Sequence, residues 1–279
     1  MTSAGPAVTR ANGEDRGALI GYLPAGFPSV DGAIEAISVM VTAGADVIEV
    51  GLPYSDPVMD GPTIQAACAR ALASGVRTRD VLRTVEAVAA SGVPTLVMTY
   101  WNPIERYGVE AFAADLAGAG GAGLITPDLI PDEADAWLAA ADQHALDRVF
   151  LVAPSSTDKR LAMTAEHCRG FVYATAVMGV TGSRDQTSEA APRLVSRTRA
   201  VTDLPVGVGL GVSSGDQAAA VAAYADAVIV GSALVRRLLD APDLRSGIRA
   251  VAALTSDLAV GVRRRGTGTH QRTQVLDRS

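Results

Sequence analysis

The chain has 279 residues, of which 48% are hydrophobic and only 4% aromatic, and its formal net charge is −6. This acidity excludes a basic field for nucleic acid or anionic lipid, and the few aromatics provide no stacking platform for single strands. No apolar stretch has the length of a signal peptide or a membrane span. We therefore expect a soluble cytoplasmic protein, with enough apolar residues for a large core.

Cysteine and histidine provide no sign of a metal site. Cys68 and Cys168 lie far apart in the chain and outside any C-x-x-C context, which favours two reduced thiols over a disulfide or a metal site. His144, His167 and His270 each stand alone in polar surroundings, so we expect them on the surface.

Continuous apolar runs alternate with segments of helical periodicity after a polar leader that ends before Ala18. The runs predict strands, and they are typical of a parallel sheet covered by helices. The predicted strands are 18–23, 47–50, 94–99, 123–125, 148–152, 171–175, 205–208 and 227–230, and the predicted helices are 33–43, 63–74, 80–90, 110–117, 132–144, 157–166, 187–200, 214–224 and a last one near 243–257.

Eight such βα units in about 250 residues favour a closed (β/α)₈ TIM barrel over an open doubly wound sheet. No linker rich in proline, glycine or serine divides the chain, so we expect a single α/β domain over residues 1–262. Residues 263–279 are polar and without periodicity, and we expect them to form a disordered tail.

Three carboxylates lie at the end of the second predicted strand or just after it. Glu49 interrupts the apolar run 47–50, and Asp56 and Asp60 follow in a loop. Strand ends of this kind form the active face of a barrel, so catalysis is favoured for Glu49 over a purely structural buried acid. Asp60 also suits a turn or a helix cap, and Asp56 suits ordinary turn chemistry.

Two glycine-rich loops follow the last two predicted strands. Gly209 and Gly211 lie in the first, and Gly231 with Ser232 forms the second. Backbone N–H groups at the start of a helix bind phosphate, which this fold usually places after strands seven and eight. A third loop, 178–184, is compatible with a mobile lid and equally with a solvated connection.

Residues 49–62, with the sequence EVGLPYSDPVMDGP, resemble the signature of the tryptophan synthase alpha chain family. Further blocks of similarity occur in the family's order at 21–28, 178–182, 209–213 and 230–233, and the resemblance extends from about residue 17 to about residue 260. It implies a (β/α)₈ barrel and a carbon–carbon lyase. The implied reaction is retro-aldol cleavage of indole-3-glycerol phosphate to indole and D-glyceraldehyde 3-phosphate.

The resemblance also implies roles for individual residues. Glu49 would be the general acid and base, and Asp60 would stabilise positive charge at the indole nitrogen. Pro53 and Asp56 would lie at a partner interface. The implied substrate-binding residues are Tyr22, Tyr100, Tyr173, Thr181, Gly182, Leu210, Gly211, Gly231 and Ser232.

The implied partner is a beta chain that holds pyridoxal phosphate, receives indole through a tunnel and forms an α₂β₂ complex; no cofactor is expected in this chain. Tyr22 replaces a phenylalanine found in other members, and Met59 and Cys68 also depart from some members. Three alternatives remain: a non-catalytic activator of a beta chain, a stand-alone indole-releasing lyase, and another phosphate-binding barrel enzyme. The presence of both Glu49 and Asp60 argues against a non-catalytic activator, and the Asp-Gly-Pro signature argues against another phosphate-binding barrel enzyme.

Overall fold

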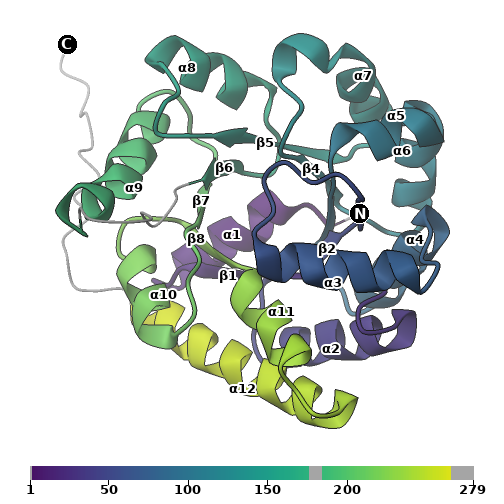
Figure 1. The fold of residues 1–279 in the computed structure, drawn as a ribbon. Coiled ribbons are helices and arrows are strands. Elements are labelled where there is room, and N and C mark those ends of the chain that lie inside the picture. The colour runs from purple at the N-terminus through teal and green to yellow at the C-terminus, as the bar shows by residue number, and fades with distance from the viewer. Residues whose placement is uncertain (1, 176–183, 265–279) are drawn as a thin grey trace, which may run out of the picture.

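Eight parallel strands close into a barrel in chain order in a computed structural model, which describes residues 2–175 and 184–264 (Figure 1). β1 pairs with both β2 and β8, so the sheet has no free edge. This architecture confirms the predicted single-domain TIM barrel. The strands are β1 (Ala18–Pro24), β2 (Val47–Gly51), β3 (Thr95–Met98), β4 (Gly123–Thr126), β5 (Asp147–Val152), β6 (Val172–Thr175), β7 (Val206–Gly209) and β8 (Ala227–Val230).

The strands are mostly apolar because both of their faces are covered. Along β2, Val47 packs with the cluster that fills the barrel, whereas Ile48 and Val50 pack in the layer between the strands and the helices. Side chains alternate along a strand, so Glu49 faces the interior, as Val47 does, but one layer nearer the carboxyl end. The position of this acid follows from the strand's period of two.

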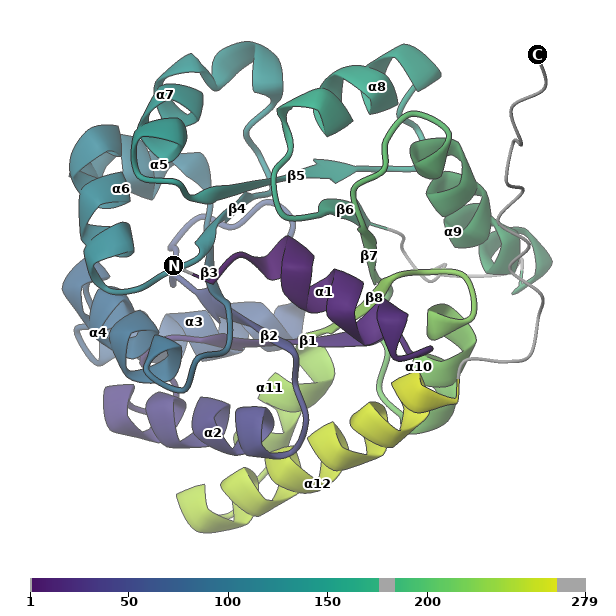
Figure 2. The same cartoon turned by 180° about the vertical axis from the view of Figure 1, so that it is seen from behind.

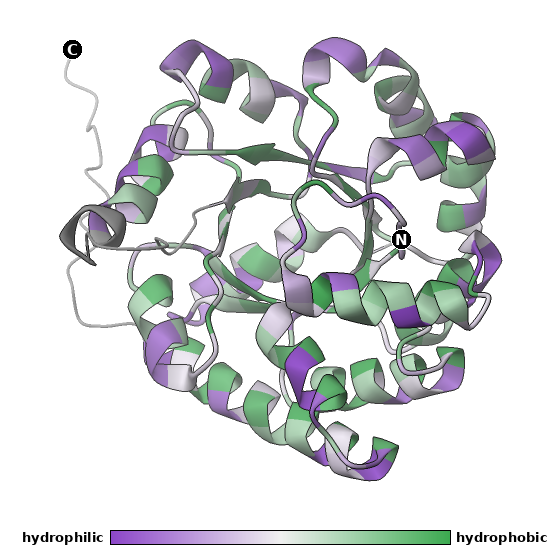
Figure 3. Ribbon diagram, viewed as in Figure 1, coloured by the Kyte–Doolittle hydropathy of each residue, from purple (hydrophilic) through white to green (hydrophobic). Residues whose placement is uncertain are grey.

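The helices surround the barrel and turn their polar faces outward (Figure 3). In α4, for example, Val81, Val85 and Val88 recur at helical spacing and are buried. The helices are α1 (Ala4–Gly13), α2 (Val30–Thr42), α3 (Pro62–Ala73), α4 (Thr78–Ala89), α5 (Trp101–Tyr107), α6 (Val109–Gly118), α7 (Asp135–Gln143), α8 (Asp158–His167), α9 (Arg184–Arg199), α10 (Gly215–Ala222), α11 (Ser232–Leu239) and α12 (Leu244–Arg263), with a 3₁₀ turn η1 (Pro131–Glu133).

No element was predicted for the polar leader before β1, and its helix was missed. It forms α1, which lies across the amino-terminal opening of the barrel (Figure 2). Ala4, Ala7, Val8 and Ala11 are buried against the interior ends of the strands. Their spacing is helical, but three of the four are alanines, which give a weak apolar signal.

Two further helices were missed. α5 occupies residues expected to be loop, and the carboxylate of Asp128 accepts the Trp101 N–H at 2.9 Å at its start. α11 begins directly after β8, where only a glycine loop was expected. The predicted helix 132–144 is divided into η1 and α7, and the last predicted helix, near 243–257, continues as α12 to Arg263; the other predicted elements agree with the structure to within a few residues.

Cys68 and Cys168 are buried free thiols. His144 and His167, which were expected on the surface, are partly exposed there, and His270 lies outside the described residues. Within residues 2–175 and 184–264, no group of three or more histidine, cysteine or acidic side chains could hold a metal ion. In the same part of the chain, no helix combines the length and apolar character needed to cross a membrane.

Candidate active site

Glu49 is a buried carboxyl group at the carboxyl end of the barrel. It is 1% exposed, and neither of its oxygens has a hydrogen-bond partner among the described residues. Burial favours the neutral form of an acid, and it raises the pKa of Glu49 to about 8. The group is therefore protonated at neutral pH and can act as a proton donor to a bound molecule.

Asp60 lies in the loop between β2 and α3 and is half-buried. Burial raises its pKa, and a hydrogen bond from Tyr100 opposes that shift. The Tyr100 hydroxyl also accepts the backbone N–H of Met59 at 3.0 Å. Tyr100 follows β3 directly and precedes α5, so a neighbouring strand end holds the loop that carries the second acid.

Tyr22 connects the two acids. It is the register partner of Glu49 across the β1–β2 pair and is 9% exposed. Burial raises its pKa well above the ordinary value, and the nearby Asp60 and Glu49 carboxylates act in the same direction. The three side chains therefore meet at one place above the barrel. A Cβ on Gly51 would lie 2.3 Å from the Tyr22 hydroxyl, so only glycine leaves room for the phenol there.

We use the word chamber for the region at the carboxyl end of the barrel where Glu49, Asp60 and Tyr22 meet. Residues of β6 and β7 form its opposite wall. Tyr173 is 9% exposed, and burial raises its pKa well above the ordinary value, with the Glu49 charge adding to the effect. A Cβ on Gly209 would lie 2.7 Å from the Tyr173 hydroxyl. Leu210 follows and is partly buried against the core. The predicted aromatic positions Tyr22, Tyr100 and Tyr173 therefore surround the two acids.

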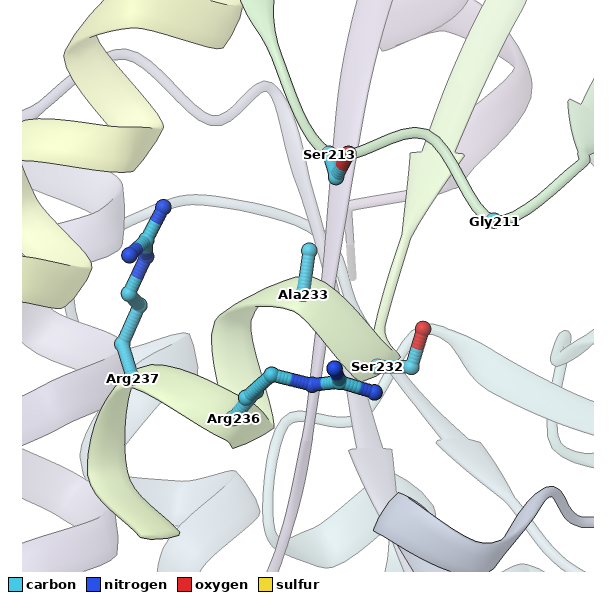
Figure 4. A pocket seen from close by; sticks show the side chains of 6 residues that line it. All are labelled: Gly211, Ser213, Ser232, Ala233, Arg236 and Arg237. Carbon is cyan, nitrogen blue, oxygen red and sulfur yellow. The ribbon is translucent and has the colours of Figure 1, made fainter. Parts of the chain in front are cut away.

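A cavity of about 280 Å³ lies beside the chamber, between the β7–α10 loop and α11 (Figure 4). Gly211 and Ser232, both predicted as phosphate positions, line it together with Ser213, Ala233, Arg236 and Arg237. Ser232 is the first residue of α11, so the positive end of that helix points at the cavity.

The residues around the cavity include several that sequence reasoning did not identify. Arg236 and Arg237 were missed, although Arg236 stands four residues after Ser232 and thus on the same helix face. Gly231 precedes Ser232, and a Cβ there would lie 3.1 Å from the Tyr22 ring. Thr181, Gly182 and the rest of the expected lid as far as residue 183 lie outside the described residues, and Arg184 begins α9.

The two residues expected at a partner interface differ in exposure. Asp56 is exposed, whereas Pro53 is buried within the chain. The same loop presents two exposed apolar side chains that sequence reasoning left without a role: Val58 is 78% exposed and Met59 is 53% exposed.

A closed (β/α)₈ barrel with a protonated buried acid and a second, half-buried acid at the carboxyl ends of its strands defines a barrel enzyme that uses acid–base chemistry. Comparison with known proteins identifies the kind of enzyme. Residues 8–263 match the tryptophan synthase alpha chain family, and the chain belongs to it.

The relatives are similar over almost their whole length. The tryptophan synthase alpha chain of Salinispora arenicola is 67% identical over 263 residues, which are 94% of this chain and 98% of that one. A structure of tryptophan synthase from Mycobacterium tuberculosis has a TM-score of 0.86 at 59% identity, covering 93% of this chain and 98% of that one. The alpha subunit from Legionella pneumophila str. Paris has a TM-score of 0.85 at 31% identity, covering 94% and 99%.

The family resemblance, the fold and the enzyme class are therefore confirmed. The chain is a carbon–carbon lyase of tryptophan biosynthesis, and its reaction is the cleavage of indole-3-glycerol phosphate to indole and D-glyceraldehyde 3-phosphate. An alpha chain implies a complex with a beta chain.

Proposed function

We propose that Glu49 and Asp60 are the two catalytic carboxyl groups of this lyase. The observation that carries the proposal is the state of Glu49: buried, unpaired within the described residues, and with a pKa of about 8. Cleavage requires a proton at C3 of the indole ring, and a neutral carboxyl group can supply it at pH 7.

One carboxyl group, Glu49, can both donate and recover the proton that the reaction needs. Glu49 gives its proton to C3, which places positive charge on the ring nitrogen. The glycerol hydroxyl next to C3 returns a proton to the Glu49 carboxylate as the carbon–carbon bond breaks. The electron pair of that bond restores the neutral indole, and the carbinol carbon becomes the aldehyde of glyceraldehyde 3-phosphate. Glu49 ends protonated, ready for the next turnover.

Asp60 serves the other end of the ring. As a carboxylate it accepts the indole N–H and stabilises the charge that develops there. Its hydrogen bond with Tyr100 supports this role, because it opposes the rise in pKa caused by burial. Two carboxyl groups in different environments thus take different parts in the reaction. Tyr22, Tyr100, Tyr173 and Leu210 line the pocket for the ring.

The phosphate binds at the cavity beside Ser232. The Ser232 hydroxyl and the backbone N–H groups of Gly211, Gly231 and Ser232 are the proposed contacts. Thr181 and Gly182, outside the described residues, are proposed to close over the substrate. Water excluded in this way cannot interfere with the charged intermediate.

The beta partner is proposed to form an α₂β₂ complex in the cytoplasm, to hold pyridoxal phosphate and to receive indole through a tunnel. Asp56 and Pro53 are the residues proposed for the interface, and the exposed Val58 and Met59 in the same loop support it. We further propose a single domain over residues 1–262; of the expected tail, 263–279, Arg263 is the last residue of α12 and residues 265–279 lie outside the described residues.

A steady-state assay tests the proposal. The purified chain is given indole-3-glycerol phosphate with and without a beta chain, and indole or tryptophan is measured. Cleavage that rises when the beta chain is added supports the lyase of a complex, whereas equal cleavage without it would indicate a stand-alone enzyme. Tryptophan formed from indole and serine but never from indole-3-glycerol phosphate would contradict the lyase.

A further inference from the structure

The cavity beside Ser232 carries positive charge without an acidic partner. Arg236 and Arg237 both line it, and neither forms an ion pair with a carboxylate of the described residues. Several other arginines are paired with a carboxylate, for example Arg83 with Asp31 and Arg160 with Asp132. In a chain whose net charge is −6, two unpaired guanidinium groups at one cavity favour the binding of an anion.

The two arginines are not equivalent. In Figure 4, Arg236 extends along α11 towards Ser232, whereas Arg237 projects away from it. The Arg236 Nη2 donates a hydrogen bond to the Thr63 Oγ1 at 3.1 Å, which fixes the guanidinium beside the cavity. Arginine has five N–H donors in a planar fork, so this bond leaves donors for an anion.

We propose that Arg236 binds the phosphate of the substrate and makes the enzyme specific for a phosphorylated glycerol chain. The inference rests on the proposed phosphate position. The guanidinium faces a phosphate seated at the start of α11, opposite the backbone of Gly211. Arginine matches phosphate oxygens in a bidentate geometry, which a serine hydroxyl and backbone donors do not supply.

The hydrogen bond to Thr63 gives Arg236 a second role. Thr63 lies in the first turn of α3, three residues after Asp60. A phosphate held by Arg236 is thereby connected to the segment that carries the second acid. Phosphate binding at one end of the substrate therefore helps to position Asp60 at the other end.

The test compares two substrates in the complex with a beta chain: indole-3-glycerol phosphate and unphosphorylated indole-3-glycerol. Arg236→Gln is expected to raise the KM for the phosphorylated substrate at least tenfold and to weaken inhibition by inorganic phosphate to a similar extent. The kcat/KM for the unphosphorylated substrate should stay within twofold. Arg236→Lys keeps the charge and should recover part of the loss.

Arg237→Gln is the matched variant, because it removes the same charge from the adjacent residue, and its KM should rise less than threefold. Thr63→Val should raise the KM for the phosphorylated substrate two- to fivefold.

An unchanged KM in Arg236→Gln would overturn the proposal. An equal rise in KM in Arg237→Gln would also overturn it, because the overall positive charge of the cavity, and not a contact from Arg236, would then account for phosphate binding. An equal loss with both substrates would indicate a structural role. An unchanged KM in Thr63→Val would overturn the connection to Asp60. If wild-type protein does not cleave the phosphorylated substrate, the proposed function itself fails.

Discussion

The hydroxyl of Tyr100 accepts the backbone N–H of Met59 at 3.0 Å, and the same hydroxyl is hydrogen-bonded to Asp60. One phenol thus holds the backbone of the β2–α3 loop and lowers the pKa of the acid next to it. The position of Asp60 and its protonation state depend on a side chain from the next strand.

Tyr100→Phe tests this relationship. The variant keeps the ring and loses the hydroxyl, so the pKa of Asp60 should rise, because burial is then unopposed. If Asp60 must be ionised, kcat/KM falls as the pH drops through that pKa, and the acidic limb should move to higher pH. We expect a loss of about tenfold at pH 7, measured as kcat/KM between pH 4.5 and 8.

Tyr54→Phe is the control for this prediction. Its ring centroid lies 5.4 Å from that of Tyr100, and its hydroxyl accepts a hydrogen bond from Asn102. This variant should leave the acidic limb in place. An acidic limb that does not move in Tyr100→Phe would show that Asp60 does not set it.

Glu49→Ala should abolish cleavage without loss of the fold, because the carboxyl group has no hydrogen-bond partner among the described residues to lose. Activity above about a tenth of wild type would refute the catalytic role. In the wild type, protonated Glu49 is required, so kcat/KM should fall as the pH rises above about 8. A rate that is flat from pH 7 to 9.5 would contradict the proposed proton donor.

Glu49 should also make the stability of the fold fall as the pH rises. Its folded-state pKa of about 8 lies above the ordinary 4.5, so the folded chain keeps a proton that the unfolded chain releases. The free energy of unfolding therefore falls between these two pH values, by about 1.4 kcal/mol for each pH unit. Glu49→Gln removes this dependence, so its advantage over wild type in urea unfolding should grow from pH 5 to pH 8. A constant difference would refute the raised pKa.

The strands were predictable because a parallel barrel buries both faces of each strand and leaves continuous apolar runs. Glu49 was recognisable because it interrupts one of those runs. The helix α1 was not, because its buried face is mostly alanine, and Asp147 was missed because a carboxylate is unusual at the start of a buried strand. It is 1% exposed and accepts hydrogen bonds from Ser3 and Ala4.

Other parts of the site depend on distances that a sequence does not contain. The contact between Tyr100 and Met59 spans 41 residues, and that between Arg236 and Thr63 spans 173. The glycines indicated a phosphate position, but Arg236 and Arg237, which also line the cavity, lie on α11, a helix that was not predicted. The identity of the substrate came from the family resemblance and not from the physical pattern.

Asp147→Ala should destabilise the protein by about 2 kcal/mol, since it removes the acceptor of the Ala4 N–H at 2.7 Å at the start of α1. Asp147→Asn keeps an acceptor oxygen and should cost less. Asp142→Ala is the exposed control: it pairs with Arg148 at the surface and should change stability by less than about 1 kcal/mol. Equal losses of unfolding free energy in urea for Asp147→Ala and Asp142→Ala would show that the buried cap of α1 stabilises the protein no more than an exposed ion pair does.

Ser232→Ala should raise the KM for indole-3-glycerol phosphate more than it lowers kcat, because the hydroxyl is proposed to bind the phosphate and not the reacting carbons. A rise of about tenfold corresponds to one charge-assisted hydrogen bond. Ser213→Ala, on the facing loop of the same cavity, is the comparison, since its hydroxyl already donates to Gln217 at 3.0 Å. A KM unchanged by Ser232→Ala would count against a phosphate contact at this hydroxyl.

Gly51→Ala should damage the active site more than the fold. The added Cβ would lie 2.3 Å from the Tyr22 hydroxyl, so the phenol must move into the chamber that the indole ring is proposed to occupy. We expect kcat/KM to fall more than about tenfold, because small displacements of positioning groups are costly. Gly61→Ala, in the same loop region, meets nothing within 4 Å and should retain activity. Steady-state kinetics of the two variants decide the matter: similar kcat/KM values for both would show that the position of Tyr22 does not limit the reaction.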